Sequence, residues 1–520
     1  MEKFNGKWTD EKTNDLILSH VGRTHAETAE HLSIKWNVKI SRDSIKNKYN
    51  TVVPPKDRVQ KIRENLVTRD SLERSVNDSD KSGKRRYFVT SAIAGCSLNL
   101  KFLQSIRTYC KEKKAKLIVL PMRGVISKNE EFPEDMMKLI GDDIYTDYTF
   151  NKNVESFDIG MSPMQLNPLV GLARFAQKRT SIIIASPKQN METVPVSNAG
   201  VPHLLHSTGA ITQPSYPQTR TGMLADEDHV VGGLILEIAD KQIFHLRQVQ
   251  AGEDGSFYDV GVKYSPSGVS KAQAEAFVLG DMHFGVEDPT AMKAWGEVID
   301  EAKPKNIFLH DVFDGRSISH HEINNISARA NRVGVQKYLQ TELDYNAESL
   351  SKLSKKHPNT IYHVVRSNHD EHLDKYLDEA RYVYDPFNYR LALTLAIYRC
   401  DGFNPLQKYI EGKVGILKNI NWLARDQDYK IAGIQMAAHG DKGANGGRGN
   451  IAGAERSYHK SITGHSHSPR ILRNAWQVGT STKLRLTYTQ GPSSWLHASC
   501  LVYNNGQRQM IIAINSQWRT

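Results

Sequence analysis

The sequence predicts an α/β protein of several domains, and three observations support this fold class. Residues 87–120 alternate a strand, a helix and a second strand, which is the pattern of a β-α-β unit. In the second half, short apolar runs end one after another in clusters of Asp, Asn and His. The chain, at 520 residues, is also longer than one domain of ordinary size.

We expect four segments along the chain. Residues 1–55 should form a small all-α domain, and residues 56–86 a charged linker or solvated helix. Residues 87–265 should form a separate α/β domain, to which the sequence assigns no role. Residues 266–520 carry the polar clusters and should form the catalytic domain.

Composition and charge narrow the class of protein. A hydrophobic content of 39% with 24% charged residues is typical of a globular protein, and no apolar run approaches the roughly 20 residues of a membrane span. The four cysteines lack metal or disulfide spacing, which favours a reducing cytoplasm. A net charge of +11, with an excess of Lys and Arg in residues 1–86, favours a polyanionic partner and nucleic acid first.

The amino-terminal residues 7–50 are expected to form three short helices. A Thr24-x-x-Glu27 capping box opens the second helix, and Ser41 precedes the third. This tri-helical unit, with a basic last helix, resembles helix-turn-helix domains of the Myb-like kind, in which the last helix enters the major groove. The alternative is a protein-docking bundle. The candidate DNA contacts on the last helix are Arg42, Lys46, Asn47 and Lys48.

Five polar clusters follow predicted strands in the second half. Side chains at the carboxyl ends of neighbouring strands converge on one crevice in open α/β sheets. Carboxylate, amide and imidazole groups without thiolates suit a pair of divalent cations, and such a pair would satisfy groups that are expensive to bury alone. The clusters are Gly280-Asp281-Met282-His283, Asp311-x-x-Asp314, Asn368-His369-Asp370, His439, and Gly464-His465-Ser466-His467.

In this order, the clusters resemble the signature of the calcineurin-like metallophosphoesterases, over residues 274–518. The resemblance implies a four-layer α-β-β-α sandwich of two mixed sheets flanked by helices. The chain departs from the pattern at His310 and Ser367, where the family usually has Gly. We interpret both as backbone-packing positions rather than ligands.

Carried over residue by residue, the resemblance implies two cations, Mn²⁺ first, with Mg²⁺, Fe²⁺ or Zn²⁺ as alternatives. A hydroxide that bridges the ions would attack phosphorus. His369 would be the general acid, with Asp370 orienting its imidazole. Asp314 would steady a ligand. The implied ligands are Asp281, His283 and His467 for one ion, Asn368, His439 and His465 for the other, and Asp311 for both.

Three cations near these clusters are candidate contacts for substrate phosphate. Arg366 either meets the phosphate or caps its strand. Lys442 and Arg448 lie in a Gly-rich stretch whose backbone amides could approach an anion, although a lid or a plain surface loop fits equally well.

The metal core alone does not determine the substrate. The basic, helix-turn-helix-like head favours a metal-dependent DNA nuclease, and the whole layout resembles phage-encoded metallophosphoesterase nucleases that degrade host DNA. DNA is then the partner, in the host cytoplasm and without a membrane, with a homo-oligomer and a regulatory protein as further candidates. The alternatives are a small-substrate phosphatase or cyclic-nucleotide phosphodiesterase, and a non-catalytic DNA-binding or assembly protein.

Overall fold

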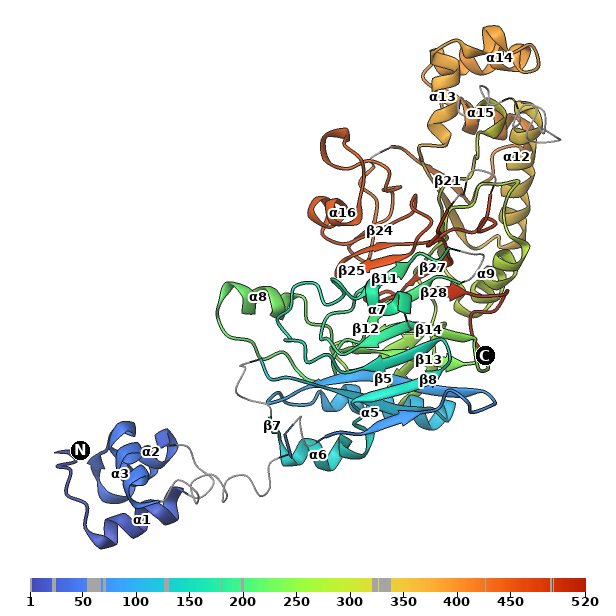
Figure 1. Cartoon of the computed structure of the whole chain (residues 1–520). Coiled ribbons are helices and arrows are strands. Elements are labelled where there is room, and N and C mark those ends of the chain that lie inside the picture. The colour runs from blue at the N-terminus through green and yellow to red at the C-terminus, as the bar shows by residue number, and fades with distance from the viewer. Residues whose placement is uncertain are drawn as a thin grey trace. The chain divides into compact units, whose positions relative to one another are not determined.

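The structure is a computed structural model, and it has two compact units (Figure 1). It describes residues 2–20, 25–53, 67–68, 72–125, 131–178, 180–197, 201–319, 326, 338–425, 427–486, 489 and 491–520. One unit is Met1–Ser71 with Glu131–Gly141, and the other is Leu72–Glu130 with Asp142–Thr520. The boundary that the sequence predicts between residues 265 and 266 therefore lies inside the second unit.

The first unit contains the three helices expected from the sequence: α1 (Asp10–His20), α2 (His25–Trp36) and α3 (Arg42–Val52). Ser41 caps α3 by accepting a hydrogen bond from the Ser44 amide, as the sequence predicts. Leu16, Leu32 and Ile45 form its core. The unit also contains α6 (Glu134–Ile140) and the strand pairs β1 (Glu2–Lys3) with β2 (Val38–Lys39) and β3 (Val67–Thr68) with β7 (Glu131–Phe132).

Two earlier expectations fall mainly outside the described residues. Within the expected linker, residues 57–74 are predicted as a solvated helix, and this range lies largely in the undescribed residues 54–66 and 69–71. Its described residues Val67–Thr68 form β3 rather than a helix. The capping residue Thr24 is also undescribed.

The second unit is mixed α/β, and one of its sheets has six strands among the described residues. β18 to β21 run parallel, and β27 and β28 close the sheet as an antiparallel hairpin. In pairing order the strands are β21 (Ile420–Leu423), β20 (Ile361–Val365), β19 (Asn306–Leu309), β18 (Ala276–Val278), β27 (His497–Val502) and β28 (Arg508–Ala513).

The largest sheet among the described residues joins strands from residues 75–207 to strands from residues 430–477. Its two halves meet where Met191 of β11 pairs with Ile471 of β25. The described strands, in pairing order, are β22 (Lys430–Ile431), β23 (Ile434–Gln435), β24 (Ser461–Thr463), β26 (Ala475–Gln477), β25 (Arg470–Leu472), β11 (Met191–Val194), β12 (His203–Ser207), β10 (Ser181–Ile184), β9 (Val154–Phe157), β8 (Asp147–Asn151) and β4 (Ser75–Asn77).

Two smaller sheets complete the unit in the described part of the chain. The four-stranded one is β14 (Phe244–Gln250), β13 (Gly232–Ile238), β5 (Arg85–Ile93) and β6 (Lys116–Met122), and the three-stranded one is β15 (Phe257–Asp259), β16 (Val262–Ser265) and β17 (Gly268–Lys271). The helices of the unit are α5 (Leu100–Lys113), α7 (Ala173–Lys178), α8 (Arg220–Glu227), α9 (Pro289–Ala302), α12 (Leu339–Lys356), α13 (Asp370–Asp378), α14 (Tyr389–Cys400), α15 (Pro405–Val414) and α16 (Ile451–Tyr458).

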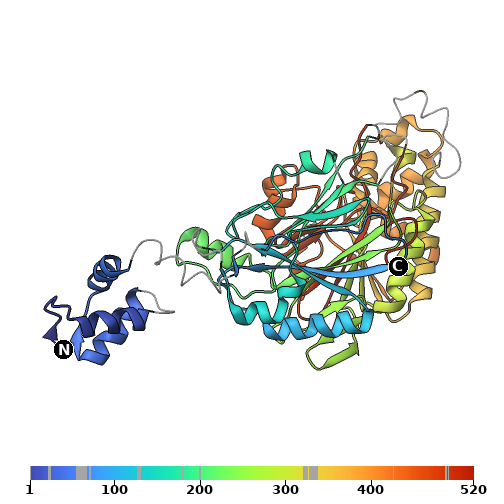
Figure 2. The ribbon, with the colours of Figure 1, turned by 60° about the horizontal axis from the view of Figure 1, so that its bottom comes forward.

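Alternation along the strands places the six-stranded sheet between two hydrophobic cores. Phe277 and Ile307 pack with the helices α9 and α12, which lie along one side of the sheets in Figure 2. Val278 and Phe308 point the other way, into a core shared with Ile462 of β24. Helices therefore cover one face of this sheet and other sheets cover the opposite face.

The sequence predicts a closing strand, a hairpin and a long helix in the second unit. The apolar pattern predicts a closing strand over residues 484–488, but the described residues 484–486 form no strand. It also predicts a hairpin over residues 498–514 around the Asn504-Asn505-Gly506 turn, and β27 and β28 form this hairpin. The sequence also predicts a long helix over residues 321–355, and the structure describes α12 within this range, from Leu339 onward. No helix in the described ranges is long and apolar enough to cross a membrane.

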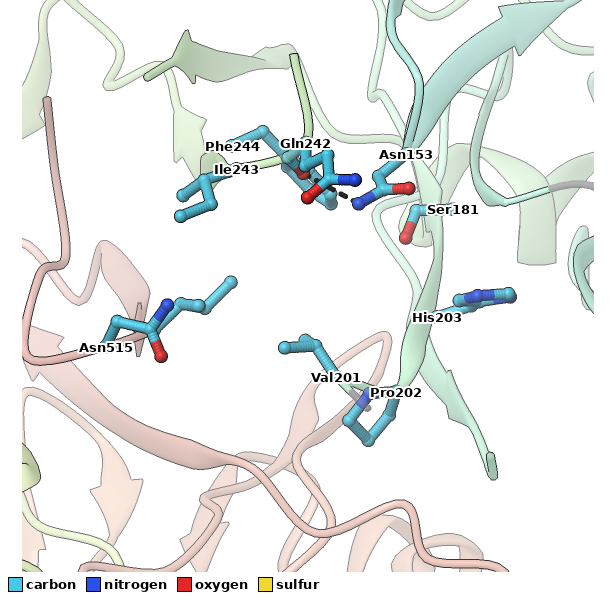
Figure 3. Close-up of a pocket in the computed structure, with 10 residues that line it drawn as sticks. Asn153, Ser181, Val201, Pro202, His203, Gln242, Ile243, Phe244 and Asn515 are labelled. Carbon is cyan, nitrogen blue, oxygen red and sulfur yellow. Dashed lines mark hydrogen bonds between the residues drawn. The ribbon is translucent and has the colours of Figure 1, made fainter. Parts of the chain in front are cut away.

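The middle segment contributes a pocket of about 280 Å³ (Figure 3). Val201, Phe244 and Asn515 line it. His203 also lines it, but its Nδ1 lies 2.7 Å from the carbonyl oxygen of Ala176. His203 therefore has a structural contact with the backbone of α7.

Candidate metal centre

The predicted ligands follow the carboxyl ends of strands from two different sheets. Asp281 follows β18, Asp311 follows β19 and Asn368 follows β20, so the parallel strands deliver them to one edge. His439 and His465 come from loops after β23 and β24 of the largest sheet. The site therefore depends on how the two sheets face each other.

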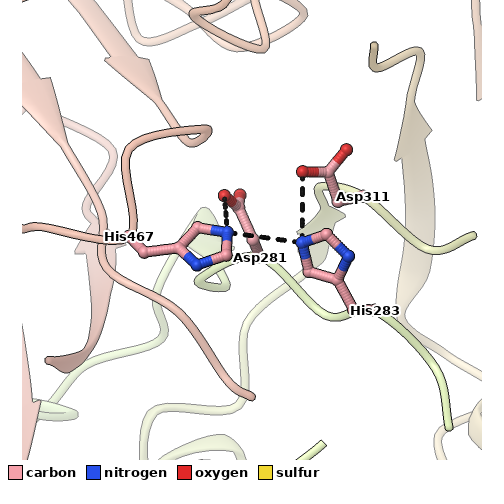
Figure 4. A group of neighbouring side chains, drawn as sticks. All are labelled: Asp281, His283, Asp311 and His467. Atoms are coloured by element: carbon pink, nitrogen blue, oxygen red, sulfur yellow. Dashed lines mark hydrogen bonds and ion pairs between the residues drawn. The ribbon is translucent and has the colours of Figure 1, made fainter. Parts of the chain in front are cut away.

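Four of these side chains form a buried group, Asp281, His283, Asp311 and His467 (Figure 4). Their potential ligand atoms all lie within 4.8 Å of one another. Nε2 of His467 is 3.1 Å from Oδ2 of Asp281, and Nε2 of His283 is 3.4 Å from Oδ2 of Asp311. Four donors converging at this spacing could hold a metal ion.

A second set of donors adjoins the first through Asp311. Nε2 of His439 lies 3.3 Å from Oδ2 of Asp311, the same oxygen that faces His283. Nδ1 of His465 lies 3.2 Å from Oδ1 of Asn368, and the ring of His465 lies against that of His439. The structure thus brings together the seven ligands that the sequence predicts, with Asp311 between the two sets.

Several buried oxygens in this cluster have no hydrogen-bond partner among the described residues. Oδ1 of Asp281 and Oδ1 of Asp311 are both in this state. Leaving a buried carboxylate oxygen unpaired is costly, whereas a cation would satisfy it. Carboxylate and imidazole donors without thiolates fit Mn²⁺, Mg²⁺, Fe²⁺ or Zn²⁺. The residues present therefore fit one or more divalent cations.

The electrostatics of the cluster point the same way. Burial opposes protonation of His439, but the neighbouring Asp311 carboxylate raises its pKa to about 9. The pKa of His283 is likewise raised, against burial, by Asp311 and Asp314. The pKa of Asp311 is held well below its usual range, against burial, by the surrounding histidines. The carboxylates thus favour positive charge beside them, which a bound cation could supply in place of the imidazole protons.

The backbone of the cluster is strained at four ligands. His283, Asp311, His465 and His467 have φ values of 41°, 47°, 74° and 59°. Residues other than Gly pay of order 1 kcal/mol to adopt this left-handed region, and such residues concentrate at functional sites. A Cβ on Gly464 would lie 2.2 Å from Oδ1 of Asp281, so only Gly fits there.

His369, the predicted general acid, lies at the edge of the cluster with a quarter of its side chain exposed. Its Nδ1 is 2.7 Å from the carbonyl oxygen of Asp314, to which it donates, so Nε2 remains for a substrate. The Asp314 carboxylate lies 2.8 Å from Nδ1 of His283, which matches the steadying role that the sequence predicts.

The contact expected between Asp370 and His369 differs in the structure. Oδ2 of Asp370 accepts a hydrogen bond of 3.0 Å from the Ser367 amide. Asp370 begins α13, and its carboxylate folds back over the preceding turn. Asp314 supplies the orienting contact to His369 instead.

The three candidate phosphate contacts have different surroundings. Arg366 forms an ion pair with Asp374 and is mostly buried, which fits the strand-capping alternative. Lys442 lies 3.3 Å from Glu371. Arg448 is exposed and forms no ion pair with any described residue.

On the amino-terminal unit, the candidate DNA contacts Arg42, Lys46 and Asn47 are exposed on α3 and Lys48 is half-buried. The helix therefore presents a basic face, as the sequence predicts.

Two further residues belong to the site but were not predicted. The His310 ring is fully buried, and its Nδ1 lies 3.3 Å from Nδ1 of His439. It could share a metal with Asp281 and His439, a possibility that the backbone-packing interpretation did not include. Its place beside Asp311 at a strand end was the available signal. Glu342 accepts hydrogen bonds from the Gly315 and Ser317 amides, which fixes the turn after Asp314, and no local pattern marks it.

Comparison with known proteins places the chain in a phage protein family. No family model matches the chain, and no solved structure matches it significantly. Protein A1 of Escherichia phage T5 is 31% identical over 464 residues, which cover 83% of this chain and 82% of A1. This coverage includes parts of both halves of the sequence, and the chain therefore belongs to the same family as protein A1 of phage T5.

Proposed function

We propose that this protein is a two-metal-ion-dependent DNA nuclease on a calcineurin-like metallophosphoesterase fold. The observation that carries the proposal is the position of Asp311 between two donor sets, at 3.4 Å from His283 and 3.3 Å from His439. One shared carboxylate flanked by oxygen and imidazole donors is the arrangement that two-metal phosphoester hydrolysis needs.

The proposal assigns each residue a task. When bound, the two cations supply an acidified water as nucleophile and neutralise charge on the phosphate. His369 donates a proton from Nε2 to the leaving oxygen, because its Nδ1 is engaged with the Asp314 carbonyl. The proposed ligands are Asp281, His283 and His467 for one ion, Asn368, His439 and His465 for the other, and Asp311 for both.

The proposed four-layer sandwich is supported by the packing of the six-stranded sheet. One of its faces packs on α9 and α12, and the other on the core shared with β24 and β26. DNA as the substrate is supported by the net charge of +11, by the exposed basic residues of α3 and by the relationship to a phage protein.

The test is incubation of circular and linear duplex DNA with the purified protein and Mn²⁺, Mg²⁺ or chelator. We expect the DNA to be degraded with Mn²⁺, and to remain intact with chelator and with the His369→Ala variant. His357→Ala, at the carboxyl end of α12 and outside the cluster, is the matched control and should cleave normally. Intact DNA after incubation of the folded wild-type protein with Mn²⁺ would refute the proposal.

A further inference from the structure

A strongly basic pocket of about 390 Å³ lies at the amino-terminal ends of β5 and β6, two neighbouring strands of the four-stranded sheet. Seven Lys and Arg side chains and a single carboxylate, Asp78, line it. The cations come from three segments, namely the loop and first residues of β5, the end of α5, and the start of β6. No predicted metal ligand is among the lining residues.

The one carboxylate is fully engaged within the fold. Asp78 is buried and accepts hydrogen bonds from the hydroxyls of Tyr87 and Tyr148, at 3.0 and 2.9 Å. Lys81 lies 2.8 Å from it and Arg85 3.6 Å. Asp78 thus fixes the floor of the pocket and balances part of the charge of two cations.

Most of the remaining positive charge has no balancing partner. Arg86 pairs with Glu237 at 3.3 Å, and Lys116 lies over the ring of Tyr148. Lys84, Lys113 and Lys114 form no ion pair within the described part of the chain. Like charges held together around a concavity repel one another, and proteins concentrate one sign of charge in this way where they attract a ligand of the other sign.

The helix dipole explains only part of this arrangement. Lysines are favoured in the last turn of any helix, and α5 ends with Lys111 and Lys113. Helix α12 ends in the same way, with Lys355 and Lys356. What α5 adds is that its last turn faces cations from two other segments across a pocket. The excess charge therefore needs a different explanation, which is an anionic ligand.

We propose that this basic pocket binds the phosphodiester backbone of a nucleic acid, away from the metal centre. The proposal rests on the nuclease function above and adds a second contact for the polymer. Cations spread over three segments match successive phosphates better than one compact anion, and such contacts are independent of base sequence. The pocket then holds long DNA on the enzyme while the metal centre cleaves it.

The experiment compares two triple variants with equal changes in charge. Lys84→Gln, Lys113→Gln and Lys114→Gln together remove the unpaired cations of the pocket. Lys352→Gln, Lys355→Gln and Lys356→Gln remove three exposed lysines of α12 as the control. Binding of a fluorescent duplex of about 30 base pairs is measured in chelator over a range of salt concentrations, so that no cleavage intervenes.

We expect the pocket triple to lose at least tenfold in affinity and to lower the salt slope by about 2 to 3, since each phosphate contact contributes about 0.9. The control triple should change neither quantity. Hydrolysis of bis(p-nitrophenyl) phosphate with Mn²⁺ should be normal in both variants, because this small substrate does not reach the pocket.

Failure of the pocket proposal and failure of the proposed nuclease function would give different results. Equal affinities and slopes for the two triples would overturn the pocket proposal, while normal hydrolysis would leave the nuclease function intact. Competition by poly-glutamate as strong as that by DNA would also overturn it, because an acidic protein would then fit the pocket as well. Absence of any hydrolysis by the wild-type protein would instead contradict the proposed function.

Discussion

The metal centre and the basic pocket gather charge in opposite ways. In the metal centre, carboxylates and imidazoles are buried, contact one another at 3.1 to 3.4 Å, and stand on a strained backbone. In the basic pocket, long cationic side chains extend from strand and helix ends, and Lys114 alone among them has a positive φ. Three of them, Lys84, Lys113 and Lys114, form neither an ion pair nor a ring contact among the described residues.

This difference reflects what each region would bind. A divalent cation needs several donors at fixed positions, and burial with a determined backbone provides them. A phosphodiester backbone is a flexible line of charges, so positive charge matters more than the exact position of any one side chain. Substitutions in the metal centre should therefore abolish cleavage, whereas substitutions of surface cations should lower DNA affinity gradually.

The largest effect is expected from Asp311→Asn. Because this carboxylate adjoins both donor sets, its loss should lower the cleavage rate at least about 10³-fold, or roughly 4 kcal/mol of barrier, and reduce the bound metal measured by mass spectrometry. DNA affinity in chelator should be unchanged. Full cleavage by this variant would show that the reaction does not need the Asp311 carboxylate.

The next effect concerns His369. Replacing it by Ala should slow DNA cleavage by about 10²- to 10⁴-fold. Metal content should stay unchanged, because Nδ1 of His369 is engaged with the Asp314 carbonyl and its ring meets His283 only edge-on, at 4.5 Å between ring centroids. A phosphoester with a p-nitrophenyl leaving group needs little protonation, so its hydrolysis should fall much less. Equal losses on the two substrates would argue against His369 as the proton donor.

The pH dependence of stability should report the charge balance of the metal centre. His439 has a pKa of about 9 in the folded protein, above its unfolded value of about 6.5. Its contribution is therefore fully present below about pH 6.5 and is lost as pH rises through about 9. The metal-free protein should lose stability over this window in urea titrations.

With Mn²⁺ bound, the free energy of unfolding should depend less on pH over this window, because a ligating imidazole carries no proton. Binding at pH 7 should then release protons, which calorimetry in buffers of different ionisation enthalpy measures. An identical pH dependence of the unfolding free energy with and without Mn²⁺ would show that His439 does not bind the cation.

A smaller effect is expected where α12 supports the metal centre. Glu342→Gln replaces an acceptor oxygen by an amide donor facing the amides of Gly315 and Ser317, which should cost about 2 kcal/mol of unfolding free energy. Glu348→Gln, exposed on the same helix, is the matched control and should be neutral. Equal urea midpoints for the two variants would show that Glu342 does not hold this turn.

The sequence could predict that the donor side chains of the candidate metal centre lie together, because they follow apolar runs and parallel strands bring their carboxyl ends together. This reasoning predicts that Asp281, Asp311 and Asn368 lie near one another. His310 was not, because a strand-end pattern does not say which way a ring turns. The partner of His369 was also misplaced, since Asp314 is 55 residues away and Asp370 is adjacent.

The sheet topology was the least predictable part of the fold. Local apolar patterns predict β5, β6, β10, β13, β14 and β15 of residues 87–265, but they do not predict β7, β8, β9, β11 or β12. They gave no sign that β11 pairs with β25, because the register of distant strands depends on tertiary packing rather than on local sequence. The middle segment and the metal-centre half consequently share a sheet where separate domains were expected.

The smallest effect is expected from the amino-terminal unit, whose α3 exposes Arg42 and Lys46. If α3 contacts DNA, the double change Arg42→Gln with Lys46→Gln removes about two phosphate contacts and should lower the salt slope by about 2. Lys7→Gln with Lys39→Gln, both exposed near β1 and β2, is the control of equal charge. The unit has its own core around Leu16 and Ile45, so neither pair should unfold it. An unchanged slope in the α3 variant would leave the basic pocket as the main electrostatic contact and favour protein docking for the three helices.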